Sequence, residues 1–91
     1  MLERTLRKNR CEVTFVVPKD YPCGQVSVVG DFNDWQPGAH PLTERPDGSR
    51  AVTVALPAKQ RFGFRYLGEG DHWFDDDRAD GHDGTNCVVQ T

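Results

Sequence analysis

The run RFGFRYL, residues 61–67, alternates large aromatic side chains with small or polar ones. Phe62, Phe64 and Tyr66 occupy every second position, which is the period of a β-strand that buries one of its faces. Arg65 lies between two of these aromatics and therefore points to the opposite, outward face. A strand of this kind needs other strands against which to bury its aromatic side, so the same period is expected elsewhere in the chain.

Period-two patterns recur along nearly the whole sequence, separated by turn residues. Asp47-Gly48 is a strong β-hairpin signal between two of them, and no segment carries the 3.6-residue apolar stripe of an amphipathic helix. Short strands at regular spacing indicate an all-β sandwich or small barrel of about seven antiparallel strands. The remaining expected strands are residues 11–17, 25–30, 41–44, 51–57, 72–75 and 86–90.

The alternation also predicts one interior for these strands. The side chains expected to face it are Val13, Phe15, Val17, Val26, Val28, Phe32, Leu42, Val52, Val54, Leu56, Phe62, Phe64, Tyr66, Phe74 and either Val88 or Val89.

Length and charge restrict the domain count and the kind of partner. The 91 residues suffice for one small domain, which we expect over 11–91, preceded by a flexible tail over 1–10. The net charge of −3 and the lack of a basic block beyond that tail argue against nucleic acid. The tail has no apolar run typical of a secretion signal, and no segment is long enough to span a bilayer. We therefore expect a cytoplasmic protein without a membrane partner.

Three cysteines, Cys11, Cys23 and Cys87, leave at least one thiol unpaired. An odd count without a signal peptide is typical of reduced cytosolic cysteines. The pattern leaves open a bridge between Cys11 and Cys87 if the segments that carry them pair. No CxxC pair is present, which argues against a thiolate zinc site.

Two tryptophans stand where a core residue is not expected. Trp35 lies among turn-forming residues in GDFNDWQPG, residues 30–38. Trp73 neighbours Phe74, the better core candidate, so alternation turns Trp73 outward on the same side as Arg65. Asn86 opens the last predicted strand. We therefore expect Trp35, Trp73, Arg65 and Asn86 to share one shallow face, although each alone is as readily explained by partial burial or a solvated surface.

Such a face suits a sugar. An indole covers the C–H patch of a pyranose ring, and side-chain donors and acceptors meet the surrounding hydroxyls. The acidic run FDDDRADGHDG, residues 74–84, suggests a metal site instead. However, Arg78 and Cys87 occupy positions where a calcium loop needs oxygen ligands. We therefore expect neither a metal nor another cofactor. The chain also lacks a recognisable nucleophile motif and has little room for the carboxylate cleft of a glycosidase.

The sequence resembles carbohydrate-binding module family 48, also called the isoamylase N-terminal or early-set domain. The resemblance rests on VSVVGDFNDW (26–35), followed by PL, an alternating strand, LP, FRYL and WFDD, and it extends from about Val13 to Gln90. It implies an immunoglobulin-like early-set β-sandwich that binds α-1,4-glucans such as glycogen, starch or maltooligosaccharides without catalysis. Relatives in this family are attached to glycoside hydrolases such as isoamylase and branching enzymes.

The resemblance also implies roles for single residues. Trp35 and Trp73 would stack on glucose, Arg65 would take the place of a lysine that binds sugar hydroxyls, and Asn86 with Thr85 would add polar contacts. Gln36 is a further contact at the rim. The alternative is an early-set scaffold domain that binds a glycan-metabolising enzyme or another protein and has lost sugar binding, because exposed aromatics suit protein interfaces equally well.

Overall fold

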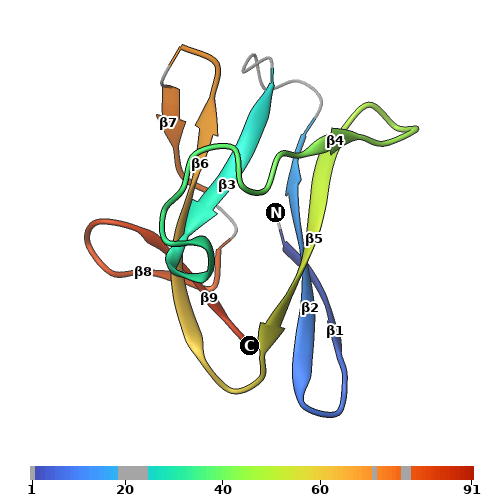
Figure 1. The fold of residues 1–91 in the computed structure, drawn as a ribbon, viewed down its shortest axis with the longest axis vertical. Coiled ribbons are helices and arrows are strands. Elements are labelled where there is room, and N and C mark those ends of the chain that lie inside the picture. The colour runs from blue at the N-terminus through green and yellow to red at the C-terminus, as the bar shows by residue number, and fades with distance from the viewer. Residues whose placement is uncertain (1, 19–24, 71, 77–78) are drawn as a thin grey trace.

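Two antiparallel β-sheets pack face to face in the computed structural model, which describes residues 2–18, 25–70, 72–76 and 79–91 (Figure 1). Sheet A has the strand order β1-β2-β5-β4, and sheet B has the order β3-β6-β9-β8, with β7 paired to β6. The strands are β1 (Leu2–Leu6), β2 (Arg10–Val17), β3 (Val26–Gly30), β4 (Thr43–Glu44), β5 (Arg50–Pro57), β6 (Arg61–Gly68), β7 (His72–Phe74), β8 (Gly81–His82) and β9 (Cys87–Gln90).

The strand orders are those of an immunoglobulin-type sandwich. Taken in chain order as strands A to G, sheet A reads A-B-E-D (β1-β2-β5-β4) and sheet B reads C-F-G (β3-β6-β9). The short strands β7 and β8 are additions in the connection between β6 and β9. The predicted all-β sandwich is therefore confirmed, with nine strands among the described residues where about seven were expected.

The core lies between the two sheets and contains the aromatic side of β6. Phe64 meets Phe15 of β2 edge to face, with 5.1 Å between the ring centroids, and Tyr66 lies 5.7 Å from Phe64. Every side chain of the predicted interior is buried in this core or packs against it, and Val89 takes the inward position while Val88 points outward. Two members of the core, Cys11 and Cys87, were not in the predicted interior; they are free thiols, each 1% exposed.

The N-terminal segment differs from the prediction. Residues 1–10 were expected to be a flexible tail, but Leu2–Leu6 form β1, which pairs with β2 in a hairpin. Two ion pairs hold this edge strand: Arg4 contacts Asp80 at 2.9 Å, and Glu3 contacts Arg45 at 3.3 Å. Local apolar periodicity does not reveal β1, because four of its five residues are exposed and the strand has no buried face to mark it.

Part of the chain lies outside the described residues. Cys23, Arg78 and nearly all of the predicted turn over 18–24 belong to it. Within the described part, no helix combines the length and the apolar character needed to cross a membrane.

Candidate functional site

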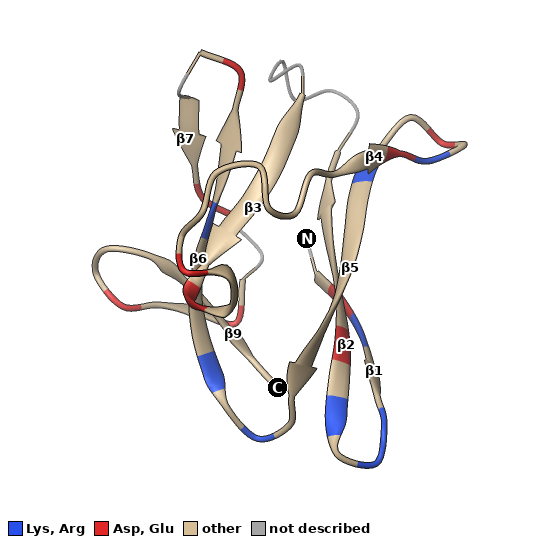
Figure 2. Cartoon of the chain, in the orientation of Figure 1, with Lys and Arg blue, Asp and Glu red and all other residues tan. Residues whose placement is uncertain are grey.

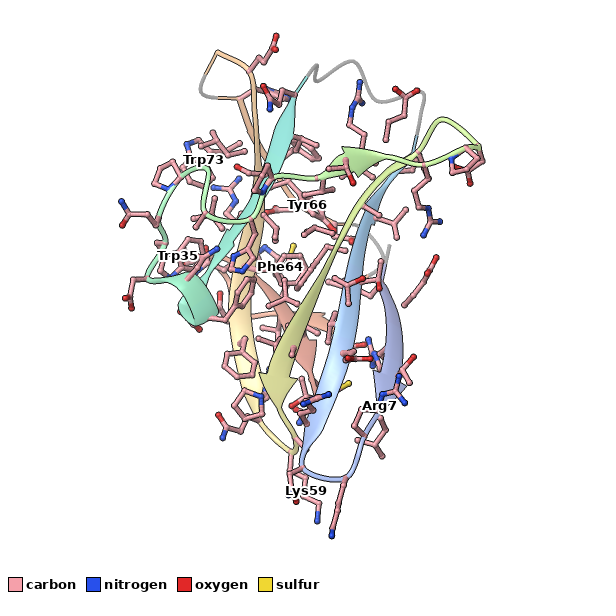
Figure 3. All side chains as sticks on the ribbon, turned by 45° about the vertical axis from the view of Figure 1, so that its right-hand side comes forward. Arg7, Trp35, Lys59, Phe64, Tyr66 and Trp73 are labelled. Carbon is pink, nitrogen blue, oxygen red and sulfur yellow. The ribbon has the colours of Figure 1, made fainter. Side chains whose placement is uncertain are left out.

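The outer face of sheet B, the side turned away from sheet A, collects the predicted site residues. In β6, Phe62, Phe64 and Tyr66 point into the core, so Gly63, Arg65 and Leu67 face outward. The register places Trp73 of β7 opposite Leu67 and Val88 of β9 opposite Gly63. Trp73 is 39% exposed. Figure 3 shows Trp35 and Trp73 on the same side of the molecule.

Trp35 reaches this face from a tight turn after β3. Residues Asp31–Asn33 form one 3₁₀ turn, and the next two residues, Asp34 and Trp35, both have left-handed φ angles of 55° and 56°. That conformation costs about 1–2 kcal/mol for each residue with a side chain. Hydrogen bonds within the turn hold it, since the Trp35 N–H donates to the Gly30 carbonyl at 3.0 Å. The strain falls on Trp35, the residue that the turn presents to the outer face. Backbone strain of this kind clusters at functional sites.

Asn33 fastens the same turn to β3 and to the segment that follows. Its Oδ1 accepts the Gly30 N–H at 3.0 Å, and its Nδ2 donates to the Val28 carbonyl at 3.1 Å and lies 2.8 Å from Nδ1 of His40. An asparagine supplies both the acceptor and the donors that these contacts need. The position of Trp35 is therefore built into the fold before any ligand arrives.

Asp31 ties the Trp35 indole to β6. One carboxylate oxygen accepts the indole Nε1–H at 2.9 Å, and the other accepts the backbone N–H of Gly63 at 2.7 Å. A Cβ added to Gly63 would lie 3.3 Å from Oδ2 of Asp31 and 3.6 Å from both Cβ and Nδ2 of Asn86. Asp31 and Asn86 therefore flank Gly63, whose missing side chain permits their close approach, and Trp35 is linked to this glycine through the Asp31 carboxylate. Trp35 is only half-buried, so part of its indole remains open to solvent.

Arg65 and Trp73 form the second part of the face. The guanidinium carbon of Arg65 lies 5.8 Å from the centroid of the Trp73 ring, within the range of a cation–π contact. The Arg65 Nε–H donates to Oδ1 of Asp75 at 2.9 Å. The cation is thus held by a ring and a carboxylate, and its side chain is still 31% exposed. An oriented guanidinium of this kind offers its remaining N–H donors to a ligand.

The turn before β9 presents Asn86 and its polar neighbour Thr85. The Asp83 carboxylate accepts the backbone N–H groups of Asn86 at 2.6 Å and Thr85 at 2.9 Å. Both hydrogen bonds lower the pKa of Asp83, and the one from Asn86 has the larger effect. Thr85 is exposed and Asn86 half-buried. A hollow of about 250 Å³ lies beside them, lined by Asp31, Gly63 and Asp83 among others.

The structure therefore brings Asn86 next to Gly63 and links Trp35 to the same glycine through the Asp31 carboxylate. Arg65, two residues further along β6, contacts Trp73 of the neighbouring strand β7. Gln36 is exposed on the loop next to Trp35. Sequence reasoning missed the roles of Asp31, Asn33 and Asp75. The role of Asp31 could have been inferred from the sequence, because an acidic residue stands four positions before a loop tryptophan. Asp75 acquires its role only from the β6–β7 pairing. Figure 2 shows acidic residues around this side of the molecule and cations at the far end of the β1–β2 hairpin.

Asp75, His82 and Cys87 bring three potential metal-ligand atoms within 4.8 Å of one another. The Gly84 N–H donates to Nδ1 of His82 at 3.1 Å, which in a neutral imidazole leaves the proton on Nε2, the atom 3.5 Å from Asp75. Burial raises the pKa of the Cys87 thiol and keeps it protonated. The Cys87 sulfur accepts the Asp76 N–H at 3.2 Å, and the Asp75 carboxylate accepts a hydrogen bond from Arg65. All three groups are thus already engaged with other protein atoms, and we propose no metal site here.

Comparison with known proteins adds no relative: no protein-family model matches this sequence, and no curated protein gives a significant match.

Proposed function

We propose that this protein binds α-1,4-glucans, such as glycogen, starch or maltooligosaccharides, on the outer face of sheet B, without catalysing their cleavage. The observation that carries the proposal is that two partly exposed indoles, Trp35 and Trp73, lie on the same side of the molecule (Figure 3), with the Arg65 guanidinium against Trp73 and the Asn86 amide beside Gly63. Flat aromatic platforms with polar groups beside them are what a pyranose ring requires.

The affinity expected for such a face is low. Covering about 50–100 Å² of each indole contributes roughly 1–2.5 kcal/mol. Two platforms and a few solvent-exposed hydrogen bonds then give about 4–7 kcal/mol, which corresponds to dissociation constants from about 1 mM to about 10 µM. A polymer with many repeats raises the apparent affinity by avidity, so a polysaccharide is the more sensitive test ligand.

Affinity electrophoresis in gels with and without glycogen tests the proposal. We expect glycogen to retard the wild-type protein, and Trp35→Ala and Trp73→Ala each to abolish the retardation. Leu6→Ala is the matched control, because Leu6 is an exposed apolar residue, 71% accessible, on the edge strand of sheet A. Products released from maltoheptaose on incubation with the protein would contradict a non-catalytic role.

The alternative is a scaffold domain that uses the same aromatics and Arg65 to bind a protein, such as a glycan-metabolising enzyme. Tryptophan and arginine are the residues enriched in the energetically dominant parts of protein interfaces. A folded wild-type protein that glycogen does not retard would favour this alternative over glucan binding.

A further inference from the structure

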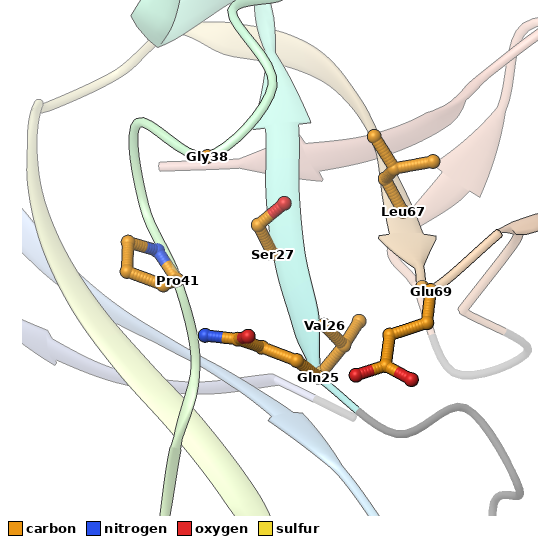
Figure 4. A pocket seen from close by; sticks show the side chains of 8 residues that line it. Gln25, Val26, Ser27, Gly38, Pro41, Leu67 and Glu69 are labelled. Atoms are coloured by element: carbon orange, nitrogen blue, oxygen red, sulfur yellow. The ribbon is translucent and has the colours of Figure 1, made fainter. Parts of the chain in front are cut away.

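A second hollow, of about 390 Å³, lies on the outer face of sheet B (Figure 4). Its lining includes Ser27 of the edge strand β3 and Leu67 of β6, which are register partners. The loop residues Gly38 and Pro41 line it as well, together with Glu69, which follows β6. The hollow is thus a trough over the β3–β6 pair, between the loop that carries Trp35 and the turn that leads to Trp73.

The loop side of the trough is held by the backbone. Pro41 forms a β-bridge with Ser27, the Val28 N–H donates to the His40 carbonyl at 3.0 Å, and the Leu42 N–H donates to the Val26 carbonyl at 2.8 Å. These contacts fasten the loop along the free edge of β3. The trough is therefore part of the folded domain and does not need a ligand to form it.

Gly38 lines the trough without a side chain. Its φ angle of 79° lies in the left-handed region that favours glycine, and a Cβ built there would meet no atom within 4 Å. Ser27 and Gly68 add only small groups to the lining. Small residues on three segments leave the volume unfilled, whereas an ordinary sheet surface would carry larger side chains here.

The lining has the mixed chemistry of a sugar subsite. Leu67 and Pro41 supply apolar surface, while the Gln25 amide, the Ser27 hydroxyl and the Glu69 carboxylate supply donors and acceptors. Figure 4 shows the Gln25 and Glu69 side chains on opposite sides of the first residues of β3. A mostly apolar hollow of a few hundred Å³ with a few polar groups is the usual form of a small-molecule site. The carboxylate favours a ligand that is rich in hydroxyls and carries no negative charge.

The trough continues the proposed glucan site. Leu67 pairs with Ser27 on one side and with Trp73 on the other, so the three residues form one row across the outer face. Two strand spacings of about 4.8 Å separate the ends of this row, a distance of roughly 10 Å. We propose that the trough is a further carbohydrate subsite that takes an additional sugar unit of the same neutral glucan beyond Trp73. This inference rests on the proposed glucan binding.

Titration calorimetry with maltotriose and maltoheptaose tests the subsite through chain-length dependence. Gln25→Ala with Glu69→Ala removes two polar groups from exposed residues, so folding is expected to be unaffected. Losing one neutral hydrogen bond from Gln25 and one charge-assisted hydrogen bond from Glu69 predicts about tenfold weaker maltoheptaose binding, with maltotriose binding changed less than about twofold. Thr53→Ala, at an exposed position of sheet A, is the matched control and leaves both affinities unchanged.

Amide chemical shifts provide the second readout. We expect maltoheptaose to shift the Ser27 and Leu67 amides in the wild-type protein and maltotriose to shift them much less. If maltoheptaose binds, and Trp73→Ala removes binding, but the double variant and these two amides show no effect, the subsite is wrong and the proposed function stands. If the folded wild-type protein binds neither oligosaccharide, the proposed function fails and the subsite fails with it.

Discussion

The Trp35 indole donates its Nε1–H to Asp31 at 2.9 Å, so the carboxylate of a neighbouring turn residue sets the orientation of the exposed ring. The other oxygen of Asp31 accepts the Gly63 N–H and so joins the turn to β6. The ring therefore does not rotate freely on its loop. A platform that is already oriented loses less conformational entropy when a ligand covers it.

Replacing this carboxylate should loosen the platform. Asp31→Asn keeps the shape but offers one acceptor oxygen, so either the indole or the Gly63 N–H loses its partner. We expect a loss of about 1.5–3 kcal/mol in the free energy of unfolding, the range for hydrogen bonds to a charged group. Urea denaturation measures it, and the Trp35 indole proton should move toward the shift of a solvent-exposed indole. Asp34→Asn, one turn residue away, is the control; an equal loss there would assign the effect to the turn in general.

Arg65 is predicted to matter more for binding than for stability. Its contacts with Trp73 and Asp75 are both partly exposed, and exposed ion pairs contribute about 0–1 kcal/mol. Arg65→Gln should therefore change the free energy of unfolding by at most about 1–2 kcal/mol once the cation–π contact is included. Glycogen retardation of this variant should fall clearly at a temperature where it remains folded. Unchanged retardation would remove Arg65 from the site.

The Arg4–Asp80 pair should hold β1 against the rest of the domain. Both carboxylate oxygens of Asp80 lie 2.9 Å from the same guanidinium nitrogen, and Oδ2 also accepts the Gln90 N–H. A double-mutant cycle with Arg4→Ala and Asp80→Ala should give a coupling of about 0.2–1 kcal/mol. Hydrogen exchange should accelerate in β1 of Arg4→Ala and stay unchanged in β5. Uniform acceleration across both strands would mean that β1 opens only when the whole domain unfolds.

The Cys87 thiol is predicted to be unreactive toward alkylating reagents in the folded protein. Burial raises the pKa of its thiol above the ordinary value of 9.0, so the protonated form is favoured on folding. Because the folded pKa is the higher one, this contribution to stability is complete below pH 9 and is lost as the pH rises through the folded pKa. In a Cys23→Ser background, iodoacetamide at pH 8 should label Cys87 only after denaturant is added. Fast labelling of the native protein would contradict its burial.

A buried hydrogen bond in the core gives a further prediction. The Tyr66 hydroxyl donates to Oδ2 of Asp76 at 2.8 Å, and the two residues are 1% and 7% exposed. Tyr66→Phe keeps the ring packing and removes this donor, which should cost about 1.5–3 kcal/mol in the free energy of unfolding because the acceptor is a carboxylate. Guanidinium denaturation measures the change. Asp76→Asn would retain an acceptor, and should therefore cost less than Tyr66→Phe.

The sequence predicted which side chains fill the interior of this protein, because the signal for burial on a strand is local. Phe62, Phe64 and Tyr66 alternate along one strand, and alternation alone tells which side is buried. Sequence reasoning failed for β1, because this strand is exposed at four of its five residues and carries no apolar alternation. It also left out Cys11 and Cys87, although each continues the buried period of its strand two residues before Val13 and Val89.

The residues of the candidate site likewise fall into two groups: those whose position the sequence predicted, and those whose position only the structure revealed. Trp73 and Arg65 were placed on one face by strand period, since their side chains follow from β6 and the strand after it. The relation of Trp35 to Gly63 and Asn86 needed the tertiary structure, because it runs through the Asp31 carboxylate and an irregular turn with two left-handed residues. Turns of this kind have no period from which a direction can be read.

By itself the amino-acid sequence determined that the chain folds as a β-sandwich and which side chains fill its interior, because burial on a strand repeats every second residue. The tertiary structure alone decided the strand order of the two sheets, the place of β1, the Asp31 link beneath Trp35 and the open trough beside Trp73. Those features depend on contacts between residues far apart in the chain, and such contacts exist only after the sheets have packed together.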